Sequence, residues 1–136
     1  MKPDTIYRRY SHVLCTLQGL FLACCLSEVQ AAPKTGSEAW YQKIWCEGKN
    51  GQLEYKLNNS SRADCLTPKY AIEMDFAHKW HEAIGQSLSY AKKTKRKAGI
   101  VLILRSEKDR AFLLELQKTI RYFHLPITVW KIESWG

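Results

Sequence analysis

Three carboxylates are spaced so that a small sheet would bring them together. Glu73 and Asp75 stand two residues apart in a stretch where apolar and polar residues alternate, so both side chains point to one face of a strand. A turn that pairs Leu66 with Ala71 would place Asp64 opposite Glu73, with Cβ atoms about 5 Å apart. Carboxylates that close repel each other unless a proton or a cation compensates, and Mg²⁺ or Mn²⁺ prefers such oxygen ligands. The spacing predicts a divalent-metal site at these three acids, with a solvated acidic face in another register as the alternative.

The residues that follow could complete a phosphate-binding site. Several polar residues recur at spacings of three and four, so they should form a stripe on one face of the next helix. They are Lys79, Glu82, Gln86, Tyr90 and Lys93. A lysine, a glutamine and a tyrosine beside three carboxylates would suit a phosphate group next to a metal ion. The basic run that ends this helix would extend the positive strip along a nucleic-acid backbone. An ordinary polar helix face is the alternative.

The elements that would position these groups follow from two hydrophobic periods. Apolar residues alternate with polar ones before Phe76 and recur at a helical period after it, whereas 100–104 is an unbroken apolar run typical of a buried strand. The first helix is expected to bury Trp40 and Ile44. A parallel crossover after Ala98 gives an α/β fold, a mixed central sheet flanked by helices. The expected elements are a helix over 38–45, strands over 53–57, 62–66 and 70–76, a helix over 76–93, a strand over 100–104, a helix over 108–124 and a strand over 127–132.

The order of these elements and acids resembles the PD-(D/E)XK nuclease superfamily. The matching residues are Asp64, then Glu73-x-Asp75 at the end of a strand, then Gln86-x-x-x-Tyr90 on the next helix, and the likeness extends over nearly all of the chain after residue 40. The resemblance implies a restriction-endonuclease-like core in which Asp64 and Glu73 hold Mg²⁺ or Mn²⁺ for phosphodiester hydrolysis.

The resemblance suggests further ligands and also includes one departure from the family pattern. The backbone carbonyl of Met74 would be a further ligand, and Glu47 would match an acid that some members add to the first helix. The family's lysine is replaced by Asp75, which removes a positive charge from the site. Lys79 is the foremost candidate to supply it from the following helix, and Lys56 is the second.

Two other constellations suggest different chemistry. His78, His81 and Glu82 fall at helical spacing and with Asp75 could bind a transition metal, although neither His-Glu-x-x-His nor Cys-x-x-Cys accompanies them. A Cys/His nucleophilic pair could use Cys65. That cysteine alternates with the proposed metal ligand on its strand and so should point away from the site.

Residues 1–31 have the pattern of a signal peptide. Basic residues precede an apolar run over 13–26, and Val29 and Ala31 are the small residues that a cleavage site requires. The run is short for a membrane span of about 20 residues. We therefore expect export to the periplasm or out of the cell without a permanent membrane span, with a retained anchor or a lipoprotein as alternatives. Residues 32–37 are expected to be a flexible leader and 38–136 a single domain.

The cysteines and the charge agree with this location and with a polyanionic partner. Only Cys46 and Cys65 lie beyond the signal peptide, and an oxidising compartment would let them form a disulfide, with free buried thiols as the alternative. The formal net charge is +8, which attracts nucleic acid or anionic lipid or simply favours solubility.

Together these patterns favour an exported, metal-dependent endo- or exonuclease that hydrolyses nucleic acid, DNA foremost. One alternative is a catalytically inactive protein of the same fold that binds DNA or another polyanion, and another is an envelope protein that contacts protein partners through its tryptophans. The candidate catalytic residues are Asp64, Glu73 and Lys79, the metal ligands Asp64, Glu73, Asp75 and Glu47, and the substrate-binding residues Gln86, Tyr90 and Lys93.

Overall fold

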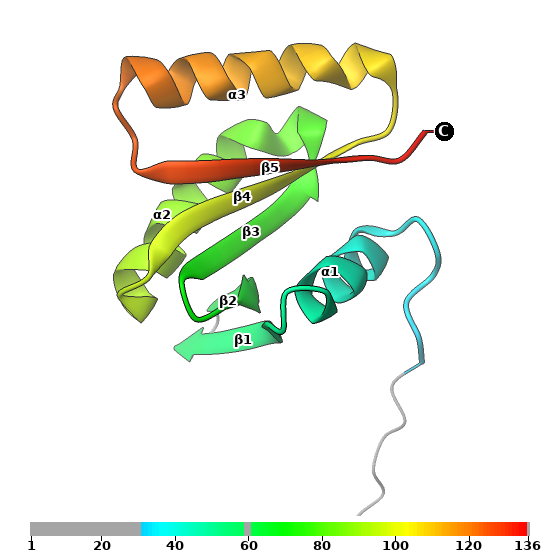
Figure 1. Cartoon of the computed structure of the whole chain (residues 1–136), viewed down its shortest axis with the longest axis vertical. Coiled ribbons are helices and arrows are strands. Elements are labelled where there is room, and N and C mark those ends of the chain that lie inside the picture. The colour runs from blue at the N-terminus through cyan, green and yellow to red at the C-terminus, as the bar shows by residue number, and fades with distance from the viewer. Residues whose placement is uncertain (1–30, 59–60, 136) are drawn as a thin grey trace, which may run out of the picture. The chain divides into compact units, whose positions relative to one another are not determined.

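A mixed sheet with three helices makes up the described part of this computed structural model, residues 31–58 and 61–135. The elements are α1 (Glu38–Glu47), β1 (Gln52–Asn58), β2 (Ser61–Leu66), β3 (Tyr70–Phe76), η1 (Ala77–Lys79), α2 (Trp80–Thr94), β4 (Lys97–Leu104), η2 (Glu107–Asp109), α3 (Arg110–Tyr122) and β5 (Ile127–Glu133). Five strands lie in the order β1-β2-β3-β4-β5 (Figure 1). The α/β class with a mixed sheet is thus confirmed.

The strand directions follow from the lengths of the connections. Only short connections separate β1 from β2 and β2 from β3 in the sequence, and both pairs are antiparallel. Helices α2 and α3 return the chain across the sheet, so β3, β4 and β5 are parallel, with Phe76 opposite Ile103 and Ile103 opposite Ile132. The predicted crossover after Ala98 is therefore confirmed.

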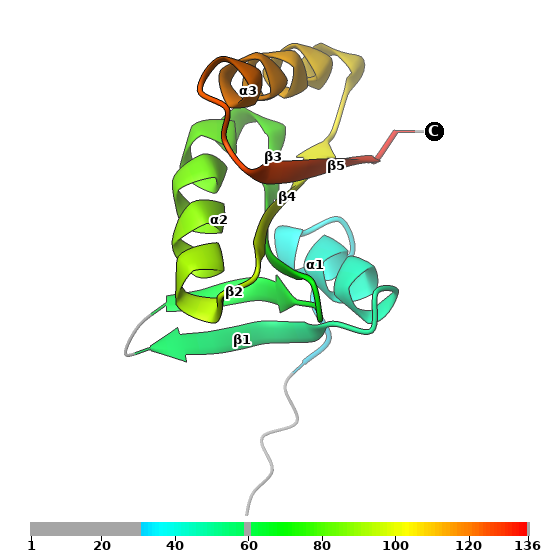
Figure 2. The ribbon, with the colours of Figure 1, turned by 60° about the vertical axis from the view of Figure 1, so that its left-hand side comes forward.

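The two faces of the sheet are covered by different helices. Helix α1 packs on one face and α2 and α3 on the other, as Figure 2 shows with β3 and β4 between α1 and α2. Alternation along β3 sends Ile72 and Met74 toward α1 and leaves Glu73 on the face that α2 covers. Strand β4 is buried from Ala98 to Leu104, as its apolar run predicts.

A disulfide joins Cys46 at the end of α1 to Cys65 in β2, with 5.6 Å between their Cα atoms. The predicted pair is therefore confirmed, and Cys65 has no free thiol to act as a nucleophile. Closing a loop of this length stabilises the folded state by about 3 kcal/mol in the chain-entropy treatment. A Cβ atom at Gly51 would lie 2.7 Å from the Cys46 sulfur, so the chain can pass the disulfide only because this residue is glycine.

The boundaries of some elements and the exposure of one residue differ from the predictions. The helix expected from Phe76 begins as the short η1 turn, because Phe76 is still the last residue of β3 and α2 starts at Trp80. Ile44, expected inside, is 51% exposed. Its side chain lines a groove instead of the core.

No helix in residues 31–58 and 61–135 is long and apolar enough to cross a membrane. The predicted signal peptide lies outside the described residues, except for Ala31.

Candidate active site

Asp64 is held between β2 and β3 by a backbone hydrogen bond. The strand pairing includes Leu66 opposite Ala71, as predicted, but continues only to Cys65 opposite Ile72. Beyond that pair the Met74 N–H donates to Asp64 Oδ2 at 2.7 Å. The expected backbone pairing of Asp64 with Glu73 is therefore replaced by a side-chain bond, which fixes the carboxylate against β3.

Glu73 is a buried carboxylate with an unused acceptor. Its side chain lies beside Asp64 and the Tyr90 hydroxyl, it is 5% exposed, and its Oε2 has no hydrogen-bond partner among the described residues. Burial and the charge of Asp64 raise the pKa of Glu73 to about 9. Burial also raises the pKa of Asp64 to about 7, although the hydrogen bond from Met74 partly offsets this. The two groups together bind a proton, or a cation, more readily than ordinary carboxylates do.

Lys79 joins a second pair of acids to this site. Its Nζ lies 3.1 Å from Asp75 Oδ1 and 3.5 Å from Glu38 Oε2. The η1 turn makes this possible because it brings Lys79 back toward the end of β3, where Asp75 is 4% exposed and also accepts the Phe76 N–H at 2.8 Å. These contacts raise the pKa of Lys79, the hydrogen bond to Asp75 most. The lysine is therefore held as a cation at the edge of the acidic cluster.

Glu38 is the residue that the sequence interpretation missed. It opens α1 directly after the N-cap Ser37 and accepts a hydrogen bond from Gln42 Nε2 at 3.2 Å. Burial, followed by the charge of Asp75, raises its pKa. The Ser37–Glu38 pair marks a helix start in the sequence, but only the packing of α1 on the sheet brings this end to β3. Glu47, proposed as the acid from this helix, lies at its other end, about 13 Å away along the axis.

The predicted stripe on α2 is divided by the fold. Tyr90 is buried against Glu73, and its pKa is raised by burial and by the nearby negative charges. Gln86 is exposed, and Lys93 donates to Ser61 on the hairpin at 2.8 Å. Tyr90 therefore faces the carboxylates, whereas Lys93 extends the cationic surface beyond them.

The histidines do not form the alternative metal centre. His81 stacks on Trp80 with ring centroids 3.6 Å apart, and His78 stacks on Phe76. No group of three or more histidines, cysteines or acids in the described part of the chain is arranged to hold a metal. Neither the predicted carboxylate ligands nor the histidines therefore form a metal site of three or more protein ligands among the described residues.

The acidic pair nevertheless has the chemistry of an incomplete cation site. Asp64 and Glu73 repel each other in a buried position when both are ionised, and no described residue donates a hydrogen bond to Glu73 Oε2. A divalent ion with water as its remaining ligands would satisfy both conditions, since Mg²⁺ commonly binds through one or two carboxylates. Asp75 is already neutralised by Lys79, so it fits a supporting position better than that of a ligand.

No protein-family model, curated protein or solved structure matches this chain significantly. The function of the protein is therefore inferred from the arrangement of these side chains.

Proposed function

We propose that this protein is a metal-dependent phosphodiester hydrolase of the PD-(D/E)XK type, with a restriction-endonuclease-like core, that acts on nucleic acid. The observation that carries the proposal is the buried pair Asp64 and Glu73, whose unpartnered oxygen and mutual repulsion favour a cation. Lys79 supports it further, because this lysine supplies a positive charge from the helix that follows β3. The ion pair between Lys79 and Asp75 compensates for the negative charge at the position where the family has its lysine.

Each residue has a distinct part in the proposed reaction. Asp64 and Glu73 would hold Mg²⁺ or Mn²⁺, which when bound polarises a phosphate oxygen and lowers the pKa of a ligated water. Lys79 stabilises charge that develops on the phosphate, since its ammonium group is positioned before the substrate arrives. Asp75 and Glu38 orient that ammonium group. Tyr90 holds the Glu73 side chain in place from α2.

The cellular location and partner belong to the same proposal. The Cys46–Cys65 disulfide is typical of proteins in an oxidising compartment, which supports export to the periplasm or the exterior. The net charge of +8 supports a polyanionic substrate such as DNA.

A second candidate is a nuclease-like protein that binds nucleic acid without cleaving it. The observation in its favour is that Lys79 contacts two carboxylates, Asp75 and Glu38, which compete with a phosphate for its charge. Such a protein would bind in a salt-dependent way and would be indifferent to chelators.

The deciding experiment incubates the purified protein with plasmid DNA and, separately, with single-stranded circular DNA, each with Mg²⁺ or Mn²⁺. The proposal expects cleavage that stops with EDTA and in the variant Asp64→Asn/Glu73→Gln, which keeps the shape of both side chains. Glu115→Gln is the matched control, because this acid lies on the exposed side of α3 and pairs only with Lys118. Salt-sensitive binding without cleavage would favour the second candidate, and a stable protein complex with no affinity for nucleic acid would favour the envelope alternative.

A further inference from the structure

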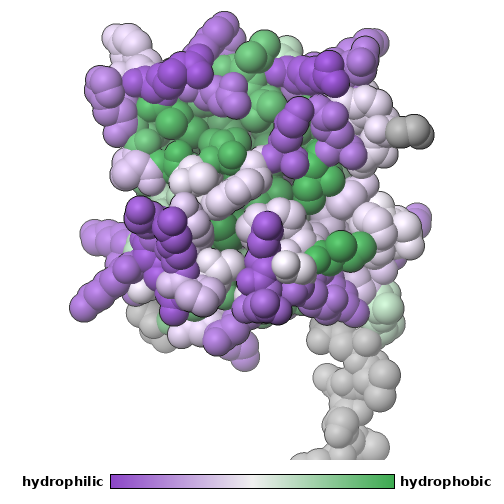
Figure 3. Space-filling view, viewed as in Figure 1, coloured by the Kyte–Doolittle hydropathy of each residue, from purple (hydrophilic) through white to green (hydrophobic). Residues whose placement is uncertain are grey.

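An aromatic groove lies on the face of the sheet that carries α1. Its volume is about 550 Å³, and it is lined mainly by apolar side chains from α1, from the end of β5 and from the residues directly after that strand. Trp40, Ile44 and Trp45 come from the helix, and Ile132 and Trp135 from the other side. Figure 3 shows pale and green side chains on this part of the molecule with purple ones around them.

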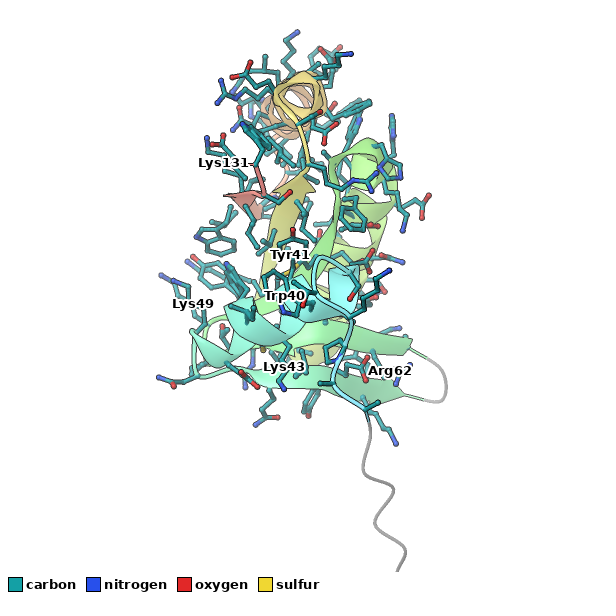
Figure 4. The ribbon with its side chains drawn as sticks, turned by 90° about the vertical axis from the view of Figure 1, so that its right-hand side faces the viewer. Trp40, Tyr41, Lys43, Lys49, Arg62 and Lys131 are labelled. Atoms are coloured by element: carbon teal, nitrogen blue, oxygen red, sulfur yellow. A yellow bond between two sulfur atoms is a disulfide. The ribbon has the colours of Figure 1, made fainter. Side chains whose placement is uncertain are left out.

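Cations already lie against the aromatic rings of this groove. The Lys49 ammonium is 5.7 Å from the centre of the Trp45 ring, and the Arg110 guanidinium is 5.8 Å from that of Trp135. Figure 4 shows Lys49 and Lys131 on the same side of the molecule, with Trp40 on α1. Aromatic faces with positive charges between them match the alternation of bases and phosphates in a nucleic-acid strand.

The acid in the lining does not oppose a polyanion. Glu133 lies 2.8 Å from Lys131 and 3.6 Å from Arg110, so its charge is neutralised by two cations. The remaining described residues that line the groove carry no charge. A negatively charged ligand would therefore meet a neutral floor and a positive margin, whereas an acidic peptide would gain little from the large flat rings.

A row of aromatic rings connects the groove with the acidic cluster. The Trp40 ring meets that of Tyr41 at 4.9 Å, and the Tyr41 ring meets that of Phe76 at 6.5 Å. Phe76 directly follows Asp75, and the Arg105 guanidinium lies 4.7 Å from its ring. These contacts lead from the groove toward Asp75 and Lys79, at the edge of the acidic cluster.

We propose that this groove stacks unpaired bases, so that the nucleic acid cleaved at the acidic site is single-stranded there. The inference rests on the proposed function, because it takes nucleic acid as the ligand of this surface. Bases inside a duplex are stacked on each other and present only their edges, so they cannot lie against Trp40 or Trp135. The groove thereby selects for unpaired strands by a contact that a duplex does not offer.

The test measures binding in EDTA by the fluorescence anisotropy of labelled oligonucleotides. Oligothymidine is compared with an abasic oligomer of the same length and phosphate charge, and with the corresponding duplex. We expect oligothymidine to bind about tenfold more tightly than either, since each stacked base contributes a factor of about this size. Equal affinities for all three would overturn the inference without requiring any variant to fold.

Variants of the groove tryptophans test whether the preference for oligothymidine comes from this groove. Trp40→Ala and Trp135→Ala should each weaken oligothymidine binding about tenfold and leave abasic binding unchanged, and Trp40→Phe should retain most of the affinity. Tyr122→Ala is the matched control, because this ring is 76% exposed on α3 and does not line the groove. Unchanged affinity in both tryptophan variants would overturn the inference.

This outcome is separable from that of the proposed function. Metal-dependent cleavage of duplex DNA that is the same in the wild type and in Trp40→Ala would overturn the groove inference and leave the hydrolase proposal standing. Base-dependent binding through the tryptophans without metal-dependent cleavage would support the groove and overturn the hydrolase proposal.

Discussion

Asp64 on β2 accepts a hydrogen bond from the backbone N–H of Met74 on β3 at 2.7 Å, at the place where the two strands stop pairing. One carboxylate oxygen therefore supports the sheet, which leaves the other oxygen for the site. Asp64 thus has a structural role through one oxygen and a chemical role through the other, and variants can distinguish the two.

Asp64→Asn should be more stable than Asp64→Ala at pH 8. The amide oxygen of asparagine still accepts the Met74 N–H, and the substitution removes a buried negative charge, so the free energy of unfolding should stay the same or rise. Alanine leaves the N–H without its partner, which costs about 1–3 kcal/mol. Urea unfolding of the metal-free protein checks this order; equal losses in both variants would contradict it.

The metal-free protein should lose stability as the pH rises from 5 to 8. The folded pKa values of Asp64 and Glu73, about 7 and about 9, lie above the value of about 4 in an unfolded chain. The folded state thus binds more protons across this range, and each such group lowers the free energy of unfolding by at most about 1.4 kcal/mol per pH unit. Urea unfolding in EDTA at each pH measures the slope.

The same linkage predicts the effect of metal. Mn²⁺ should raise the melting temperature more at pH 8 than at pH 5, because it competes with protons for the two carboxylates. Glu73→Gln should flatten the pH slope and abolish the metal effect. A slope unchanged by this variant would show that other groups cause it.

Replacing Lys79 should slow cleavage more than it weakens folding. Lys79→Met removes the ammonium group, and the loss of one preorganised charge at a phosphate costs about 100- to 1,000-fold in kcat. Lys79→Arg should retain part of the activity, since its charge can still reach Asp75. Circular dichroism establishes that both variants fold, and similar activity in Lys79→Met and the wild type would exclude this role.

Glu38→Gln should reduce cleavage about three- to tenfold, the rate equivalent of one ordinary hydrogen bond, because Lys79 loses one of its two carboxylate contacts. Glu47→Gln is the matched control on the same helix and should leave the rate unchanged, since Glu47 lies at the far end of α1. Initial rates on one DNA substrate compare the two variants.

Reduction of the Cys46–Cys65 disulfide should lower the free energy of unfolding by about 3 kcal/mol, as measured by urea titration with and without reductant.

Gly51→Ala should destabilise the oxidised protein more than the reduced one, because free thiols can rotate away from the added methyl group, whereas the bonded sulfurs cannot. An equal cost in both redox states would contradict this explanation.

Much of the fold could be predicted from local pattern. Alternation defined β3, the unbroken apolar run defined β4, and the change of period after Phe76 defined the following helix. The turn between β2 and β3 was also readable, because Leu66 and Ala71 pair as expected. Exposed positions on α1 were harder to predict. Ile44 is apolar at helical spacing, yet it lines a groove together with residues from the end of β5 and beyond, which no local pattern reveals.

The sequence by itself determined the α/β order of elements and the proximity of Asp64 and Glu73. These depend on neighbours along the chain or on one turn, where backbone geometry leaves few choices. Only the tertiary structure decided that Glu38 and not Glu47 joins Asp75 and Lys79, and that Trp40 and Trp135 share a groove. The physical reason is that these contacts join residues far apart in the chain, whose meeting is set by how α1 packs on the sheet and not by any local period.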